Sequence, residues 1–225
     1  MKSNKAALTR RLKKLFVPIV SDVLDEMGVT GNVFPPDLRP IRPRVKVAGF
    51  ALTARTERYA DFTKVNLEEW IDVMIRMLEA AQPLDVFVVS TGNSIHAASW
   101  GELMSNAAQS RGAVAAVTDG AVRDVPRILS MRPSFPVYAR AHNPADAKGR
   151  LKYVEYNILV ECAGIKVNPA DIIFGDLDGV ACIPSADAVT VIQRSEEKLS
   201  KEHQFRRAVR RGVPVSEAFA KYRTF

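Results

Sequence analysis

The sequence has few of the residues that form disulfide bonds or zinc sites. Among 225 residues there are two cysteines, Cys162 and Cys182, and three histidines scattered along the chain. A zinc site needs clustered cysteine and histidine ligands, and the sequence contains neither such a cluster nor a Cys-x-x-Cys pair. Both cysteines lie in apolar stretches, which is typical of reduced core residues. We therefore expect a cytoplasmic protein whose two thiols are buried.

Long hydrophobic runs are also absent. No apolar stretch of the sequence approaches the roughly 20 residues that a membrane helix needs. The start, MKSNKAALTRRLKKLF, is basic but has neither the apolar core nor the small-residue cleavage site of a secretion signal. A mitochondrial presequence would also be rich in arginine and poor in acids, so that alternative stays open. We expect no membrane association. Glycine fingerprints for phosphate binding are missing too, so no nucleotide site is predicted.

Basic residues outnumber acidic residues at both ends of the chain, and the net charge of the whole chain is +7. Residues 1–50 carry ten basic and four acidic residues, residues 191–225 carry nine and four, and the stretch between them carries 13 and 17. Basic terminal helices would suit a nucleic-acid binder. However, the aromatic motifs of RNA-binding domains are absent. We therefore expect solvated or subunit-contact surfaces at both ends and no nucleic-acid partner.

The composition is that of an ordinary globular protein, with 47% hydrophobic and 25% charged residues. A chain of this length can bury a sizeable core, which predicts a single domain over residues 1–225. Its expected parts are amino-terminal helices (1–31), an α/β core (45–184) and carboxyl-terminal helices (185–225).

Local patterns place several elements within these parts. Pro18 predicts the start of a second amino-terminal helix, and Asn66 with Glu69 resembles a capping box. Ser185 predicts the cap of a long helix over 186–211, which is basic enough to suit contact with a neighbouring subunit. The remaining predictions are a strand over 47–56, a loop over 128–136, a strand over 136–141 and β structure over 156–184 with turns at 168–169 and 175–176.

Residues 92–127 hold most of the information about function. An apolar strand over 86–89 precedes them, and a Gly/Asn/Ser turn then predicts an amphipathic helix over 97–111, ended by Gly112. Next, AVAAV indicates a second buried strand that ends in a turn at Asp119-Gly120. Arg123 and Asp124 follow directly. The polar residues therefore gather at the carboxyl ends of strands, the edge where open α/β sheets usually bind ligands.

This arrangement suggests a particular chemistry. The free N–H groups at the start of the helix suit a carboxylate or phosphate. Glu102 is separated from Arg123 by 20 residues, and an intervening helix and strand would fold it back beside Arg123 and Asp124. Such a set suits a divalent metal and a small oxo acid. Spacing alone leaves the alternative open, because most Arg-Asp pairs are solvated turn residues or surface ion pairs.

Several motifs resemble those of the RraA-like family, which includes the class II 4-hydroxy-4-methyl-2-oxoglutarate / 4-carboxy-4-hydroxy-2-oxoadipate aldolases. The resemblance covers most of the chain, in the family's order. Its motifs are SDVLDEMGVTG (21–31), VAGFALTAR (47–55), WGEL (100–103), VTDGAVRD (117–124) and NPADIIFGDLDGVACIP (168–184). It implies a layered β/β/α sandwich, like that of the swivelling phosphohistidine domain, with helices at both ends. One position departs from the family: Glu102 replaces an aspartate and sets its carboxylate one methylene further out.

The resemblance also implies an activity and a site. The activity is a metal-dependent lyase reaction that forms pyruvate from a 4-hydroxy-2-oxo acid, or decarboxylates oxaloacetate, through a pyruvate enolate. Asp124 and Glu102 would hold Mg²⁺ or Mn²⁺, and Arg123 would stabilise the enolate oxygen. The amides around Gly101, Glu102, Leu103 and Met104 would bind the substrate carboxylate.

Two further expectations come from the same resemblance. Family members are trimers or hexamers with sites at subunit interfaces, and a glutamate from the neighbouring subunit approaches the site. Glu202 is the best candidate for that glutamate. The alternative function is that of a non-catalytic regulator, because some RraA-like proteins bind and inhibit an RNA-degrading enzyme.

Overall fold

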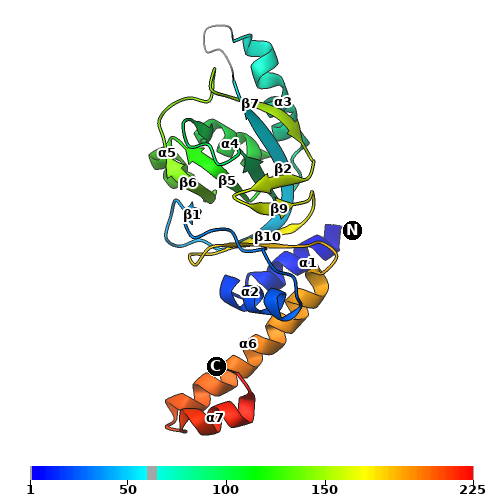
Figure 1. Ribbon diagram of the computed structural model, residues 1–225, viewed down its shortest axis with the longest axis vertical. Helices are drawn as coiled ribbons and strands as arrows, with labels where there is room; N and C mark the ends of the chain where they lie inside the picture. The colour runs from blue at the N-terminus through cyan, green and yellow to red at the C-terminus, as the bar shows by residue number, and fades with distance from the viewer. Residues whose placement is uncertain (1, 60–64, 225) are drawn as a thin grey trace.

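The computed structural model describes the backbone of residues 2–59 and 65–224. Its elements are shown in Figure 1. The helices are α1 (Lys2–Leu12), α2 (Val17–Glu26), α3 (Leu67–Ala80), α4 (Glu102–Ser110), α5 (Val125–Ser130), α6 (Ala188–Arg210) and α7 (Val215–Tyr222). The strands are β1 (Arg39–Pro40), β2 (Val47–Arg58), β3 (Asp85–Ser90), β4 (Ala98–Trp100), β5 (Ala115–Val122), β6 (Val137–His142), β7 (Leu151–Tyr156), β8 (Val160–Cys162), β9 (Ile165–Val167), β10 (Ile172–Gly175) and β11 (Val180–Ile183).

Within the described residues, nine strands form one curled sheet in the order β1-β6-β5-β3-β2-β10-β11, with β4 paired to β5 and β7 paired to β2. Strands β2, β3, β5 and β6 run parallel to one another. The neighbours β10 and β7 run antiparallel to β2. Every residue of β3 and β5 is buried, as expected for central parallel strands covered on both faces.

Alternate residues of β3 pack against different layers. Phe87 and Val89 face the cluster built by α3, α4 and α5, whereas Val86 and Val88 face the cluster that includes the small β8–β9 sheet. This is the two-residue period of a strand covered on both sides. The fold is therefore mixed α/β, with β structure on one face of the curled sheet and helices on the other, as predicted.

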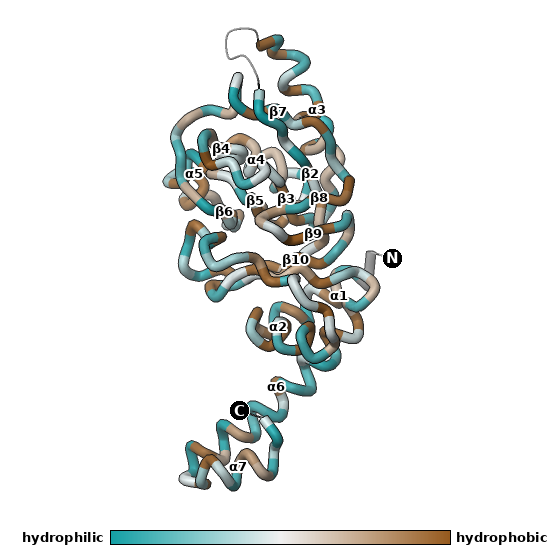
Figure 2. The backbone as a smooth tube through the Cα atoms, in the orientation of Figure 1, coloured by the Kyte–Doolittle hydropathy of each residue, from teal (hydrophilic) through white to brown (hydrophobic). Residues whose placement is uncertain are grey.

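Helices from both ends of the chain pack together beneath β10 and β11. Residues of α1, α2 and α6 share a hydrophobic cluster with Phe50, Ile172 and Phe174. Beyond this cluster α6 projects away from the body, and α7 folds back along its far end (Figure 1). Hydrophilic residues dominate α6 in this projecting part, whereas hydrophobic residues gather in the body (Figure 2). No helix among the described residues is long and apolar enough to span a membrane.

Several local predictions are confirmed. Pro18 lies in the first turn of α2, and Asn66 caps α3 by accepting hydrogen bonds from the Glu68 and Glu69 amides. A tight turn joins β10 to β11, with Asp176 N–H donating to the Gly179 carbonyl. Cys162 and Cys182 are free and buried in the core.

Four predicted boundaries are wrong. The helix expected over 97–111 starts at Glu102, because residues 98–100 pair with β5 as β4. No turn forms at Asp119-Gly120, since β5 continues to Val122. The stretch 128–136 is not all loop, because α5 extends to Ser130. The helix predicted after Ser185 starts at Ala188, with Asp187 in the cap position.

Candidate functional site

Arg123 and Asp124 lie where β5 ends, beside the start of α4. Strands β4 and β5 are parallel, and Trp100, the last residue of β4, pairs with Val122, the last of β5. Their carboxyl ends are therefore adjacent, and the Arg123 N–H donates to the Trp100 carbonyl over 3.0 Å. The pairing of two short segments thus brings Gly101 and Glu102 to the Arg-Asp pair.

Buried Trp100 also fixes the first turn of α4. Its indole N–H donates to Oγ of Ser105 over 2.9 Å, and this hydroxyl donates to the Gly101 carbonyl over 2.9 Å. The two bonds tie the helix start to the strand before it. Because Trp100 is 1% exposed, this anchor is part of the core.

The Asp124 carboxylate lies against the backbone of the α4 start. Its Oδ2 accepts the Glu102 N–H over 3.3 Å and lies 3.6 Å from Nε of Arg123. The Asp124 backbone is left-handed, with φ 57° and ψ 28°, in the cap position of α5. A Cβ on Gly101 would stand 3.0 Å from Oδ2 of Asp124 and 3.3 Å from Cγ of Arg123. A side chain at Gly101 would therefore press against both the Asp124 and the Arg123 side chains.

The Glu102 side chain lies along its own helix. Glu102 is the first residue of α4, and its backbone N–H donates a hydrogen bond to the Asp124 carboxylate. Its side-chain Oε1 accepts a 2.5 Å hydrogen bond from Nδ2 of Asn106. Of the other two predicted amide donors, Leu103 has a 76% exposed side chain and Met104 packs partly against the helical core.

The structure places one further carboxylate, that of Asp146, beside Arg123, and the sequence did not indicate it. This residue follows β6, and its Oδ1 lies 3.3 Å from NH1 of Arg123. Arg123 thus stands between two carboxylates, with its own side chain 34% exposed. The signal that would have found Asp146 is topological: β6 is the parallel neighbour of β5, so its carboxyl end reaches the same edge.

A second acidic residue close in sequence, Asp119, is wholly structural. It is 0% exposed, and its carboxylate accepts from the Thr91 N–H and hydroxyl, the Asn93 N–H and the Ala163 N–H. These bonds fasten the loop after β3 and the β8–β9 turn to β5. Asp119 therefore holds the loops at the carboxyl-terminal edge of the sheet in place, and its carboxylate is not free to bind a ligand there.

The acidic side chains are sparse for a metal centre. In residues 2–59 and 65–224, no group of three or more His, Cys, Asp or Glu residues is placed to hold a metal ion. Asp124 and Glu102 are two partly exposed carboxylates at one helix start. That number suits Mg²⁺ or Mn²⁺, which commonly bind one or two carboxylates and complete their shells with water and substrate oxygens.

Comparison with known proteins identifies the family. The model for RraA-like proteins, described as Aldolase/RraA, matches residues 17–182. The chain belongs to the RraA-like family. One relative, from Halalkalibacterium halodurans, is named "Putative 4-hydroxy-4-methyl-2-oxoglutarate aldolase"; it is 26% identical over 200 residues, which cover 89% of this chain and 87% of the relative.

Solved structures share this RraA-like fold. An uncharacterized protein from Pseudomonas syringae superposes with a TM-score of 0.84 at 21% identity, over 96% of this chain and 94% of that one. Streptomyces coelicolor RraAS2, described as an unusual member of the RNase ES inhibitor RraA protein family, has a TM-score of 0.78 at 22% identity, over 88% and 95% of the two chains. At these identities the likeness shows the fold.

Among the described residues of this RraA-like chain, Glu202 forms no hydrogen bond or ion pair with Arg123, Asp124 or Glu102. It is on α6, where its Oε2 is 3.6 Å from NH2 of Arg206 and its side chain is 21% exposed. A single protomer therefore does not bring Glu202 to the site. Its contribution from a neighbouring subunit stays a prediction.

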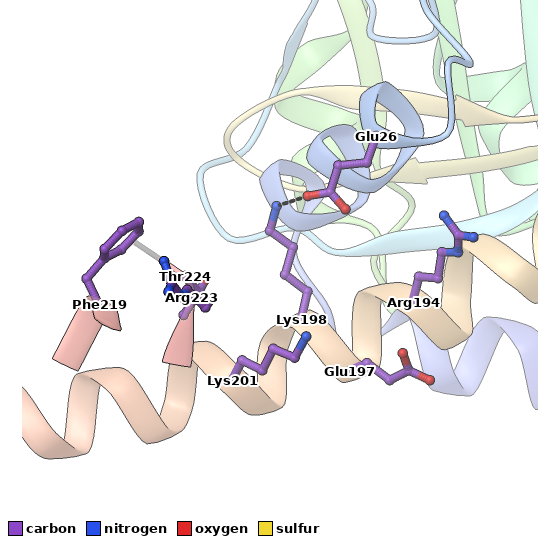
Figure 3. A pocket seen from close by; sticks show the side chains of 8 residues that line it. All are labelled: Glu26, Arg194, Glu197, Lys198, Lys201, Phe219, Arg223 and Thr224. Atoms are coloured by element: carbon purple, nitrogen blue, oxygen red, sulfur yellow. Dashed lines mark hydrogen bonds and ion pairs between the residues drawn. The ribbon is translucent and has the colours of Figure 1, made fainter. Parts of the chain in front are cut away.

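A cavity of about 530 Å³ lies where α6 leaves the body. Figure 3 shows its lining from α2, α6 and α7, including Lys198, whose ammonium contacts Glu26 over 2.8 Å. Lys198 also pairs with Asp22 over 2.9 Å. The cavity is lined by both acidic and basic side chains, Lys198 holds α6 against α2, and no lining residue belongs to the Arg123 site.

Proposed function

We propose that this protein is a divalent-metal-dependent lyase that forms pyruvate from 4-hydroxy-2-oxo acids, decarboxylates oxaloacetate, or does both. The observation that carries the proposal is the meeting of three groups at one sheet edge: the Arg123 guanidinium, the Asp124 carboxylate and the amino-terminal amides of α4. The name of the Halalkalibacterium relative supports the aldolase chemistry. Both reactions cleave a bond to C3 of a 2-oxo acid, so one site would serve both.

The first turn of α4 would hold the substrate carboxylate. The first intrahelical bond runs from Ser105 N–H to the Gly101 carbonyl, 3.1 Å, and the Glu102 N–H is taken by Asp124. No acceptor for the Leu103 or Met104 N–H is found among the described residues. These two amides, at the positive end of the helix dipole, suit an anion.

Asp124 would hold the divalent cation, with Glu102 contributing directly or through water. For this the Glu102 carboxylate would turn away from Asn106, which its exposure at the helix start permits. Mg²⁺ or Mn²⁺, when bound, polarises the 2-oxo group of the substrate. The oxygen donors and their partial exposure fit such a hard cation.

Arg123 would supply the stabilisation specific to the transition state. In the retro-aldol reaction the 4-hydroxyl would give its proton to solvent water as the C3–C4 bond breaks, so the leaving fragment departs as a carbonyl compound, whereas in decarboxylation it departs as CO₂. In both reactions the electron pair of the broken bond moves toward the 2-oxo oxygen. A guanidinium beside that oxygen gains more from the developing charge than from the neutral ketone. Asp146 keeps the guanidinium in place by pairing with its NH1. Protonation at C3 then gives pyruvate.

The assembly belongs to the same proposal. One protomer leaves the site open, with the Arg123 and Asp124 side chains 34% and 38% exposed. A trimer or hexamer would cover it, and Glu202, on α6, would reach the site of a neighbour.

The deciding experiment measures pyruvate release from oxaloacetate and from 4-hydroxy-4-methyl-2-oxoglutarate, with Mg²⁺, with Mn²⁺ and with EDTA. We expect metal-dependent turnover, and a fall in kcat/KM on the order of 10²-fold or more for Arg123→Ala. Arg127→Ala is the matched control, because Arg127 is an exposed arginine on α5. A folded protein that turns over neither substrate with either metal would contradict the proposal, as would equal losses in both variants.

A non-catalytic regulator is the second candidate. The observation that favours it is Glu102, which replaces the family's aspartate and bonds its carboxylate to Asn106. The Glu102→Asp variant separates the two functions. If the protein is a regulator because of this replacement, lyase activity will be absent in the wild type and will appear in the variant.

A further inference from the structure

Four arginines and a histidine form a stripe along the carboxyl-terminal end of α6. They are His203, Arg206, Arg207, Arg210 and Arg211, and they line a hollow of about 330 Å³ whose described lining contains no carboxylate. Their spacing, i, i+3, i+4, i+7 and i+8, places all five on one face of the helix. All five are exposed. We call this set the arginine stripe.

The charge of the arginine stripe is almost unpaired. Within the described chain, only Arg206 of the stripe approaches a carboxylate, with its NH2 3.6 Å from Oε2 of Glu202, and this distance is too long for a hydrogen bond. The other four residues of the stripe form no hydrogen bond or ion pair with any residue that the structure describes. Their N–H donors are therefore available, and the mutual repulsion of the arginines favours a partner that carries several negative charges.

The stripe faces away from the rest of the molecule. The buried residues of α6 end at Ser195, and beyond the hydrophobic cluster the helix projects from the body (Figure 1). The face of α6 toward α7 carries Lys201, which lines the cavity between the two helices together with Phe219 (Figure 3). Arg210 follows Lys201 by nine residues, about two and a half turns, so the stripe lies on the opposite side of α6. A large partner therefore has access to it.

This face of α6 offers charge and hydrogen bonds but little apolar surface. No large hydrophobic side chain of the described residues 190–212 is exposed. A protein partner would need an apolar core at the interface, and a membrane surface would need an apolar helix face beside the cations. Phe219, which is exposed on α7, lies on the other side of α6. Interfaces with nucleic acids, in contrast, are polar and strongly cationic, and the arginine fork matches phosphate oxygens.

The arrangement of the stripe favours a duplex over a single strand. At four-residue spacing it contains two rows, His203-Arg207-Arg211 and Arg206-Arg210. Two rows on one helix would meet phosphates of the two strands that border the major groove of B-form DNA, which is about 12 Å wide and admits an α-helix. Single strands are bound by stacking on aromatic side chains, which the stripe lacks, and the major groove of duplex RNA is too narrow.

We infer that the arginine stripe binds the phosphate backbone of duplex DNA, independently of base sequence. The expectation of no nucleic-acid partner rests on the absence of aromatic RNA-binding motifs, and contacts to duplex phosphates need no such motif. The inference goes beyond the proposed lyase and does not depend on it. It is also compatible with Glu202 at a subunit contact, because Arg211 lies nine residues further along, about two and a half turns, and so on the other side of α6.

The test measures the fluorescence anisotropy of a labelled random-sequence DNA duplex of about 20 base pairs with the full chain, in EDTA, between about 50 and 200 mM KCl. Four arginines on phosphates predict that the logarithm of the binding constant falls with the logarithm of the salt concentration with a slope of about −3.6. The variant Arg207→Gln, Arg210→Gln, Arg211→Gln should bind about tenfold more weakly or worse at the lowest salt, and its slope should be shallower by about 2.7.

Two further variants control for net charge and for folding. Arg10→Gln, Lys13→Gln, Lys166→Gln removes the same charge from exposed positions elsewhere, and should keep the salt slope and keep the affinity within about twofold. Replacing the same three stripe arginines by lysine keeps the charge, so this variant should keep the salt slope. Circular dichroism should show equal helix content in all variants.

Absence of duplex binding by the wild type at the lowest salt would overturn the inference, as would equal losses in the glutamine variant and the charge-matched control. Tighter binding to single-stranded DNA, to duplex RNA or to poly-glutamate than to duplex DNA would assign the stripe to a different partner and would also overturn it. Pyruvate release has no bearing on these outcomes, so failure of the lyase and failure of the inference are distinguishable.

Discussion

Oδ1 of Asp119 accepts two hydrogen bonds from Thr91, one from its backbone N–H over 2.6 Å and one from its hydroxyl over 2.9 Å. With Oδ2 bound to two further amides, the buried carboxylate joins the loop after β3 and the β8–β9 turn to strand β5. We expect Asp119→Ala to lower the free energy of unfolding by about 3 kcal/mol or more, because several buried donors would lose their acceptor. Urea unfolding measures this loss.

The matched control is Asp178→Ala, which removes an exposed carboxylate from the β10–β11 turn and should change stability by about 0.5 kcal/mol or less. Equal unfolding free energies for the two variants would show that the Asp119 bonds are not needed to hold the loops.

Asp124 offers a way to separate charge from backbone conformation. Its φ of 57° lies in the left-handed region, which asparagine tolerates better than alanine. Asp124→Asn should therefore leave thermal stability almost unchanged, and Asp124→Ala should lower it by about 1 kcal/mol. Both variants should lose metal-dependent pyruvate formation. Activity retained in Asp124→Asn would show that the carboxylate charge is not required.

The ion pair between α1 and α6 predicts a dependence of stability on pH. Arg11 donates to both carboxylate oxygens of Glu196, over 2.9 and 2.7 Å, and these hydrogen bonds lower the pKa of Glu196. A carboxyl whose pKa is lowered by folding stabilises the protein at pH values above its ordinary pKa, and this stabilisation is lost as the pH falls through the lowered value.

Glu196→Gln should accordingly cost about 0.5 to 1 kcal/mol at pH 7, a small value because both side chains are more than one third exposed. The difference from wild type should vanish in acid. Glu197→Gln, one position further along α6, is the control and should show no such trend. A difference that grows as the pH falls would contradict this account.

The two thiols should be unreactive in the folded protein. Burial raises the pKa of both Cys162 and Cys182, and the nearby carboxylates of Asp119 and Asp171 add to the effect. The thiolate is the reactive form, so a disulfide reagent at pH 8 should label neither cysteine until urea unfolds the chain. Rapid labelling of Cys162 in the native protein would show that the β8–β9 layer opens readily.

The sequence predicted that Arg123 and Asp124 lie at the carboxyl-terminal edge of the sheet, because the direction of parallel strands determines which loops share that edge. Two buried strands joined by a helix must run in the same direction, so the segments after them, including Arg123 and Asp124, lie together. Asp146 escaped prediction because its own loop carries no signal. Its place depends on β6 being the next parallel strand, which only the assembled sheet determines.

The wrong boundaries also have tertiary causes. Residues 98–100 are extended because β5 offers them a partner, and three residues have no strand preference that would show in isolation. Asp119-Gly120 has the local character of a turn, yet Thr91 and Ala163 supply donors that keep the chain extended there. Gly120 fits because a Cβ at this position would stand 2.7 Å from Cγ2 of Thr91. Such contacts between distant segments override local propensity.

Strand β2 takes part in the sheet with neighbours from very different parts of the chain. Phe50 pairs with Asp85 on one side and with Ile172 on the other, and Ala54 pairs with Tyr156. During synthesis β2 therefore emerges long before two of its three partners, with one edge unprotected. Closing the long loops between them costs chain entropy before any contact is gained, which slows folding and leaves an open strand edge available to other chains. The pairing that completes the sheet around β2 is thus also the step in which a nascent chain is most exposed to aggregation.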